Sequence, residues 1–176
     1  ALEADPVHAS FRRISSLGPQ AIATIVGAIG DVSRFEDVDA VKRYLNVAPI
    51  ALPQTGEVDQ EGRPVQVWRM PANTYRRVQG QLQLVYESPG LKTVREAAYL
   101  WFDLVVKCAK SAPGDPFVQL YERLKHKHQG RPRWFGKVRW KVIAKLISVI
   151  YHCLRKGEAY DPAKLNFTSL KMQARA

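Results

Sequence analysis

The stretch WFGKVRWKVIAKLISVIYHCLR, residues 134–155, decides the fold class that this chain is expected to adopt. Its apolar residues recur every three or four positions: Val138, Val142, Leu146, Val149 and Cys153. A second repeat on the opposite side consists of cations: Arg133, Lys137, Lys141 and Lys145. This spacing predicts a long helix with one face in a hydrophobic core and one basic face.

Helical signals continue on both sides of this stretch. Asp5 and Asp115 each precede a proline, an N-cap and first-turn pair that opens a helix. The predicted helices cover residues 5–14, 19–29, 37–46, 73–88, 91–110 and 115–128, with a loop at 46–64 and a short strand in PVQVWRM, residues 64–70.

We therefore predict an all-α domain, with at most one short β-ribbon around residues 57–69. The expected core contains Leu17, Ile25, Leu45, Trp101, Leu104, Leu120, Val142, Leu146 and Val149. The expected parts are 1–46, a helix-hairpin-helix-like segment; 47–70, a loop and short strand; 71–157, a basic helical part; and 158–176, a tail.

Charge is distributed unevenly along the chain. Residues 1–61 hold 5 basic and 9 acidic residues, whereas residues 62–176 hold 22 basic and 7 acidic ones. Between Arg123 and Lys156 there are eleven lysines and arginines and no Asp or Glu. A basic field this segregated favours a polyanionic partner, most often nucleic acid, over a merely solvated basic face.

Several other classes of protein are disfavoured. The longest apolar stretch, VIAKLISVIY, is too short to span a bilayer, and the charged first residues do not form a signal peptide. Cys108 and Cys153 lie in apolar helical patterns, which favours reduced thiols and a cytoplasmic protein. His126 and His128 are expected in solvent, and no set of His, Cys, Asp or Glu predicts a metal site.

The N-terminal stretch SSLGPQAIATIVGAIGDVSRF, residues 15–35, predicts a turn between two helices. A turn with Gly18 before a helix resembles a helix-hairpin-helix, whose backbone N–H groups hold a phosphate without reading bases. Ser16 occupies a place where that motif usually has glycine. The alternative is that Gly18 only ends a helix and that the later glycines allow close packing.

The order of further motifs carries a resemblance to a known family. After the turn come GDVSRF, then KRYLNVAP, QTG, DPFVQLYERLKHK and CLRKGEAYDP. This series resembles the C-terminal domain of the insertion-sequence transposases related to the Piv DNA invertase, the family of insertion sequence one-ten, which includes bridge-RNA-guided recombinases. The family's Asn-x-x-Leu-Arg segment matches residues 73–77 or, alternatively, the start of the 91–110 helix.

The resemblance implies a DNA-binding and strand-exchange domain that acts in DNA transposition. The family's nucleophilic serine precedes a glycine, and here Thr55-Gly56 stands in that place. Thr55 is therefore the candidate catalytic residue, with the alternative that it is only a turn residue. The resemblance also implies an N-terminal nuclease-like domain that uses Mg²⁺, a homo-oligomeric full-length protein and a guide RNA as a further partner. It further implies that the protein itself is nucleoid-associated. We expect residues 1–176 alone to be inactive and without a cofactor.

The candidate DNA-binding residues combine the turn with the basic half of the chain. They are Gly18, Arg69, Arg76, Arg77, Arg131, Arg133, Lys137, Arg139 and Lys141. Trp134 could stack on an unpaired base, although a core position is the more usual one for such a residue. The alternative function is a non-catalytic DNA- or RNA-binding module, a degenerate relative of the family.

Overall fold

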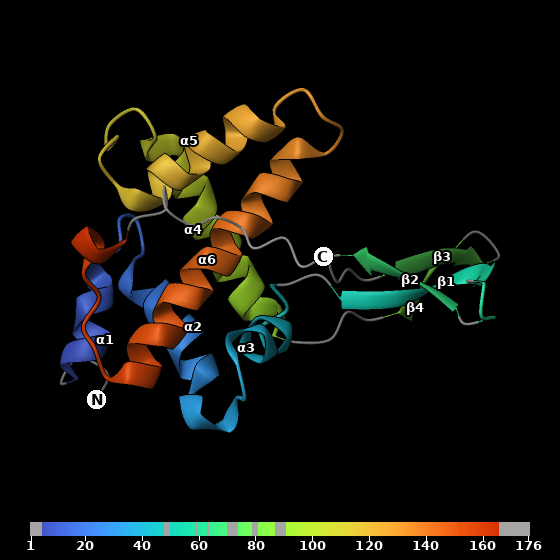
Figure 1. Ribbon diagram of the computed structural model, residues 1–176, viewed down its shortest axis with the longest axis horizontal. Coiled ribbons are helices and arrows are strands. Elements are labelled where there is room, and N and C mark those ends of the chain that lie inside the picture. Colours follow the sequence, from blue (N-terminus) through green and yellow to red (C-terminus); the bar gives the residue numbers. More distant parts are fainter. Residues whose placement is uncertain are drawn as a thin grey trace.

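The computed structural model describes the backbone of residues 5–47, 50–58, 60–62, 64–69, 74–78, 81–86 and 91–165. It describes side chains in residues 5–47, 60–62, 81 and 91–165. The helices form one body, and four strands extend from one side of it (Figure 1).

The helical body follows the local signals of the sequence. Its α-helices are α1 (Pro6–Ser10), α2 (Pro19–Ile29), α3 (Val38–Tyr44), α4 (Lys92–Cys108), α5 (Pro116–His128) and α6 (Trp134–Lys156). Short 3₁₀ turns are η1 (Phe11–Arg13), η2 (Val32–Arg34) and η3 (Pro162–Lys164). Asp5 accepts a hydrogen bond from Val7 N at 2.8 Å, and Asp115 accepts from Phe117 N at 2.9 Å, so both predicted caps are confirmed.

The core forms around α4 and α6. Helices α3 and α5 pack against α6, and α2 packs against α4 (Figure 1). Trp101 is 1% exposed, donates from Nε1 to the Ser15 carbonyl at 3.0 Å and meets the Phe117 ring edge-on. The predicted helical class is confirmed.

One predicted core residue is wrong. Leu104 is 43% exposed, whereas the other predicted members of the core are buried. The buried arc of α4 consists of Val94, Ala98, Trp101, Phe102 and Val105. Leu104 lies outside this arc, on the side of exposed Leu100, because a step of three residues from Trp101 turns it away from the arc's centre.

The strands form two separate antiparallel ribbons. The first pairs β1 (Ile50–Val58) with β2 (Pro64–Arg69), so the predicted ribbon is present but begins earlier, and the loop predicted over 46–64 is wrong for β1. The second pairs β3 (Thr74–Val78) with β4 (Gln81–Tyr86), one ribbon more than predicted.

The helix predicted over residues 73–88 is therefore wrong. Its second half, QLQLVY, alternates polar and apolar residues with period two, which is the pattern of a strand. Pairing with a neighbouring segment satisfies the backbone groups of such a short piece, and this pairing outweighed its helical propensity.

Two further findings concern membranes and thiols. In the part of the chain that the structure describes, no helix combines the length and apolarity needed to cross a bilayer. Cys108 and Cys153 are free thiols and half-buried, as expected.

Candidate nucleic-acid interface

A turn with Ser16 and Gly18 joins the first helical segment to α2, as the sequence predicts; whether it acts as a helix-hairpin-helix stays a prediction. Ser16 adopts φ +62°, the left-handed conformation that favours glycine, at the position where a helix-hairpin-helix usually has glycine. Gly18 is the exposed N-cap of α2, and a Cβ added there would meet no atom within 4 Å. The Ser15 carbonyl accepts from Trp101, which anchors the turn to α4. The turn therefore presents an open helix N-terminus on a fixed base, although its first arm, α1 with η1, is short.

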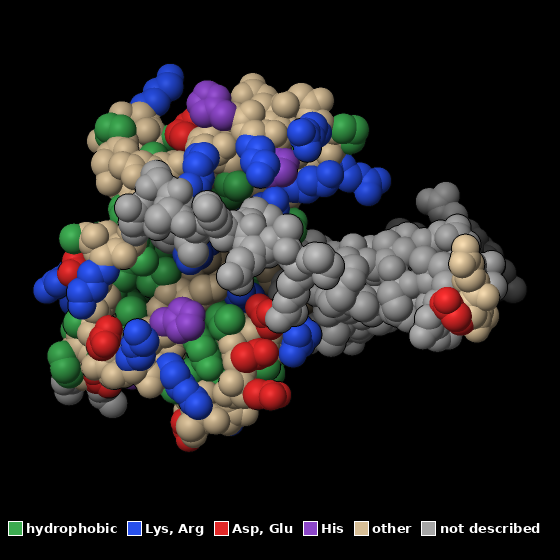
Figure 2. Space-filling model, in the orientation of Figure 1, with side chains coloured by type: hydrophobic (Ala, Val, Ile, Leu, Met, Phe, Trp, Pro, Cys, Tyr) green, Lys and Arg blue, Asp and Glu red, His purple; other side chains and the backbone are tan. Residues whose placement is uncertain are grey.

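A group of cations surrounds one histidine where α5 meets α6. We call Lys127, His128, Arg131, Lys137 and Lys141 the α5–α6 basic centre. His128 is only 8% exposed, and its Nε2 lies 3.1 Å from Lys141 Nζ. Figure 2 shows Lys, Arg and His side chains gathered over this end of the molecule.

The electrostatics of the centre follow from burial and from like charges. Burial lowers the pKa of His128 most, and the charges of Lys141, Arg131, Lys127 and Lys137 lower it further. A neutral imidazole can accept a hydrogen bond from the Lys141 ammonium through Nε2. The prediction that His128 lies in solvent is wrong, because its position at the end of α5 turns it onto α6; His126 is exposed as expected.

The adjacent residues of α6 differ in how firmly they are held. Arg133 is an exposed N-cap with φ +56°, and Lys137 is exposed one turn later. The Arg139 guanidinium lies 4.2 Å from the centroid of the Tyr99 ring, so an aromatic face of α4 holds it. Trp134 is half-buried and packs against the core, which is the more usual role of a tryptophan at such a position.

The other predicted site residues lie in the ribbons. Arg69 is in β2, and Arg76 and Arg77 are neighbours in β3. Thr55 lies in β1, between Pro53, which pairs with Gln66, and Val58, which pairs with Pro64. The side chains of these four site residues lie outside the described residues. From Pro53 to Val58 the backbone of β1 advances five residues, whereas the paired backbone of β2 advances only two, from Gln66 to Pro64. Thr55 therefore lies within an irregularity of the strand pairing.

The acidic cluster near α3 has structural roles. Asp31 accepts from Ser33 N at 2.8 Å, and this hydrogen bonding to Ser33 lowers its pKa. Asp37 accepts from Ala40 N at 2.7 Å as the cap of α3, and Asp39 pairs with Lys42 at 3.1 Å. Within the described ranges, no three His, Cys, Asp or Glu side chains gather in a way that could hold a metal ion.

Sequence reasoning placed Lys145 on the basic face of α6 but missed the second basic group that it forms with His152, Lys156 and Lys42. Burial and the charges of Lys145, Lys156 and Lys42 lower the pKa of His152, in that order. Three of these residues follow positions i, i+7 and i+11 of α6, a spacing that places them on one helix face. This spacing could have predicted from the sequence that Lys145, His152 and Lys156 lie together. The position of Lys42 near His152 could not be predicted in this way, because it depends on how α3 packs against α6.

Comparison with known families supports an assignment for the N-terminal part of the chain. Residues 8–67 match the model of the transposase IS116/IS110/IS902 family. No curated protein and no solved structure gives a significant match. The matched residues include the turn at Gly18, helices α2 and α3, and Thr55 in β1. Over these residues the chain is similar to transposases of the IS116/IS110/IS902 family, which suggests a role in transposition.

Proposed function

We propose that this chain is the DNA-binding and strand-exchange domain of an insertion-sequence transposase. It acts together with an N-terminal nuclease-like domain in a homo-oligomer, and a guide RNA is a further partner. The observation that carries the DNA-binding role is the α5–α6 basic centre, where four cations surround the buried His128 and Lys141 Nζ lies 3.1 Å from its Nε2.

Phosphate groups fit this centre for an electrostatic reason. Burial lowers the pKa of Lys141 first, and the charges of Lys127 and Lys137 lower it further, so the ammonium groups repel one another. A phosphate anion placed among them relieves this repulsion and releases counterions from DNA. Such contacts fix the position of a strand without reading its sequence.

The turn at Gly18 supplies a second phosphate contact of a different kind. Backbone N–H groups at the start of α2, an eleven-residue helix, point along the helix axis toward solvent. The open space at Gly18 allows a strand to approach this backbone closely.

The DNA-binding role is tested by charge reversal. A fluorescent 20-base-pair duplex is titrated with the wild-type chain and with Arg133→Glu/Lys137→Glu/Lys141→Glu. A matched control, Lys92→Glu/Lys107→Glu/Lys110→Glu, makes the same charge change at exposed positions on and just after α4. We expect wild-type affinity to fall steeply with salt, by about 0.9 logarithmic units per phosphate contact and per tenfold rise in salt.

We expect the first triple variant to lose most of its affinity and the control to lose much less. Because Lys141 is half-buried, the double variant Arg133→Glu/Lys137→Glu, at two exposed positions, keeps the test valid if the triple variant unfolds. If the control and the α6 variants lost equal amounts of affinity, binding would depend on net charge alone. That result would contradict the proposal that the α5–α6 basic centre is a specific DNA-binding surface.

For strand exchange we propose Thr55 as the attacking hydroxyl. An alcohol needs a base or another activating group before it attacks a phosphodiester. The Mg²⁺ expected for the full-length protein belongs, in this proposal, to the nuclease-like domain.

This role is tested in the full-length protein with its own element ends. Thr55→Ala should abolish recombination, and Thr55→Ser should retain or increase it, because serine keeps the hydroxyl without the β-branch. Equal recombination by wild type and both variants would place the chemistry at another residue. No recombination by any of them, with DNA binding intact, would favour the non-catalytic binding module.

A further inference from the structure

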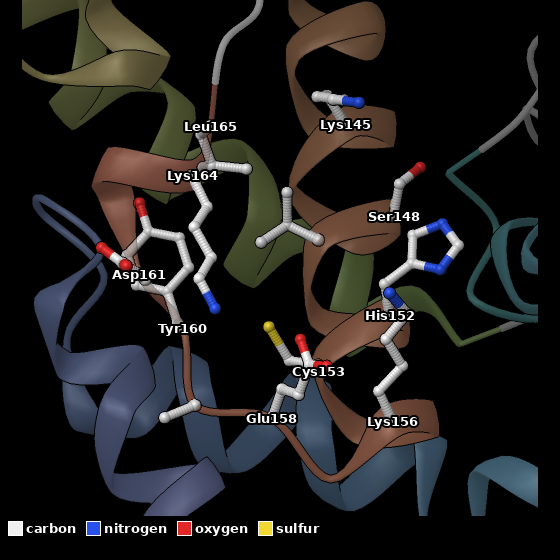
Figure 3. A pocket seen from close by; sticks show the side chains of 12 residues that line it. Lys145, Ser148, His152, Cys153, Lys156, Glu158, Tyr160, Asp161, Lys164 and Leu165 are labelled. Atoms are coloured by element: carbon white, nitrogen blue, oxygen red, sulfur yellow. The ribbon is translucent and has the colours of Figure 1, made fainter.

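One side of α6 carries polar groups along most of the helix. Steps of three or four residues place six positions within an arc of about 100° around the helix axis. These positions hold four lysines, a serine and a histidine, which we call the α6 stripe: Lys137, Lys141, Lys145, Ser148, His152 and Lys156. Figure 3 shows the second half of the stripe, from Lys145 to Lys156, along one side of the helix.

The stripe joins the two basic groups of α6 into one surface. The α5–α6 basic centre contributes its first two lysines, and the second basic group contributes its last three residues. Ser148 lies between them, and its hydroxyl donates to the Ala144 carbonyl at 2.8 Å, so its oxygen can still accept a hydrogen bond. Because the sequence of α6 contains no Asp or Glu, no carboxylate of the helix interrupts the stripe.

A pocket beside the second half of the stripe keeps its partly buried residues within reach of a ligand. The pocket has a volume of about 260 Å³ and separates the end of α6 from the segment that carries Tyr160 and Lys164 (Figure 3). Lys145 is half-buried but lines this pocket together with His152, which is exposed. An anion that lies over the pocket can therefore reach both side chains.

Carboxylates lie beside the stripe rather than within it. Asp39 on α3 pairs with Lys42 at 3.1 Å, and Glu158 and Asp161 line the pocket from the segment after α6. Lys42 lies close enough to the stripe to lower the pKa of Lys145, after the larger effect of burial. The second half of the stripe therefore has a further cation at its border with α3.

The charges of the stripe repel one another in the free protein. Burial lowers the pKa of Lys141, Lys145 and His152 first, and the charges of neighbouring cations lower it further. Like charges four residues apart on one helix face are destabilising. A row of phosphates laid along the stripe would relieve this repulsion and release counterions.

The length and composition of the stripe favour a duplex over a single strand. From Lys137 to Lys156 the helix rises about 29 Å, at 1.5 Å per residue, which equals about eight base pairs at 3.4 Å each. A duplex is stiff over this distance, so it can lie along one unbroken helix and contact both ends at once. Proteins that bind single strands use aromatic side chains on which bases stack, and the stripe contains no Phe, Tyr or Trp.

We propose that the α6 stripe is one continuous binding surface for double-stranded DNA, whose phosphates lie along it from Lys137 to Lys156. The inference rests on the proposed function in that the partner is DNA. It adds that the contact continues beyond the α5–α6 basic centre to the far end of α6. Contacts of this kind hold the duplex without reading its sequence.

The test measures the salt dependence of binding after the far end is neutralised. A fluorescent 20-base-pair duplex is titrated at several salt concentrations with wild type, with Lys145→Gln/Lys156→Gln and with the control Lys92→Gln/Lys107→Gln, at exposed positions of α4. Each phosphate contact contributes about 0.9 to the slope of log affinity against log salt. We expect the α6 variant to lose about 1.8 of this slope and the control to keep the wild-type slope.

A single variant guards against a folding artefact, because Lys145 is half-buried. Lys156→Gln changes an exposed residue and should lower the slope by about 0.9. An unchanged slope in both α6 variants, with wild-type binding intact, overturns the inference and leaves the α5–α6 basic centre as the DNA-binding surface. An equal loss of slope in the control also overturns it, because binding then depends on net charge.

Two further ligands test the choice of partner. A 20-nucleotide single strand should bind more weakly than the duplex, and an RNA duplex of the same sequence should bind no more tightly than the DNA duplex. A single strand that binds as tightly as the duplex, or an RNA duplex that binds more tightly, overturns the assignment of the stripe to double-stranded DNA. Failure of the wild-type chain to bind the DNA duplex at low salt contradicts the proposed function and this inference together.

Discussion

The two ends of α6 both place lysines around a histidine, but the histidines differ in burial. At the α5–α6 basic centre, His128 is 8% exposed and lies 3.1 Å from Lys141 Nζ. At the other end, His152 is largely exposed beside a pocket, and its partial burial and then the charges of three lysines lower its pKa. The comparison shows that a buried histidine can contact one lysine of its cluster directly, whereas beside the exposed histidine two of the lysines, Lys145 and Lys156, line a pocket.

Both ends depend on the same apolar support. Val142, Leu146 and Ile150 are 0% exposed and lie on the side of α6 that faces the core. The cations on the outer side are therefore carried by one continuous helix of 23 residues. A substitution in that apolar support should therefore destabilise both ends of α6 together. A substitution of one histidine should change the properties of its own end alone.

The largest expected effect comes from the shared support. Leu146→Ala should lower the free energy of unfolding by about 2–5 kcal/mol, because it leaves a cavity in a closed part of the core. Leu100→Ala, at a leucine that is 67% exposed, should change it by about 0.5 kcal/mol or less. Urea denaturation measures both values. Similar values for the two leucines would show that α6 is not the common support.

A smaller effect concerns pH and should separate the two histidines. The folded-state pKa of His128 lies below its usual value near 6.5, so the unfolded chain binds a proton first as the pH falls. Stability should therefore be complete above about pH 6.5 and should decrease from there down to the folded-state pKa. The pKa of His152 is lowered too, so its contribution has the same sign.

Thermal unfolding between pH 5 and pH 8 measures this difference. His128→Gln should remove more of the pH dependence than His152→Gln, because His128 is the more buried of the two and also lies beside Lys141. A larger effect from His152→Gln would reverse the comparison between the two ends.

The smallest expected effect is a local shift of histidine pKa. Lys141→Met removes a neighbouring charge and a hydrogen bond to the neutral ring, so the pKa of His128 should rise while that of His152 stays the same. Lys145→Met should raise the pKa of His152 and leave that of His128 unchanged, because Lys145 is the first of the charges that lower the pKa of His152. Titration of the ring signals by NMR measures both. If either variant moved both histidines equally, the two groups would form one coupled cluster.

Parts of the candidate site could be predicted because they depend on neighbours along the chain. The basic face of α6 follows from a spacing of four residues, and the turn at Gly18 follows from glycine and proline at a helix start. The place of Thr55 in an irregular strand could not be predicted in this way. It depends on β2, whose pairing compensates for a proline and a glycine within β1.

By itself, the sequence determined the bounds of most helices and the uneven charge. Asp5 and Asp115 cap their helices through their own side chains, and this needs only the next few backbone N–H groups. Only the tertiary structure decided that residues 74–86 pair as strands, that Leu104 faces solvent, that His128 lies against Lys141 and that a pocket adjoins Tyr160. Each of these features depends on contacts between elements, and local propensity is too weak to determine which of those contacts form.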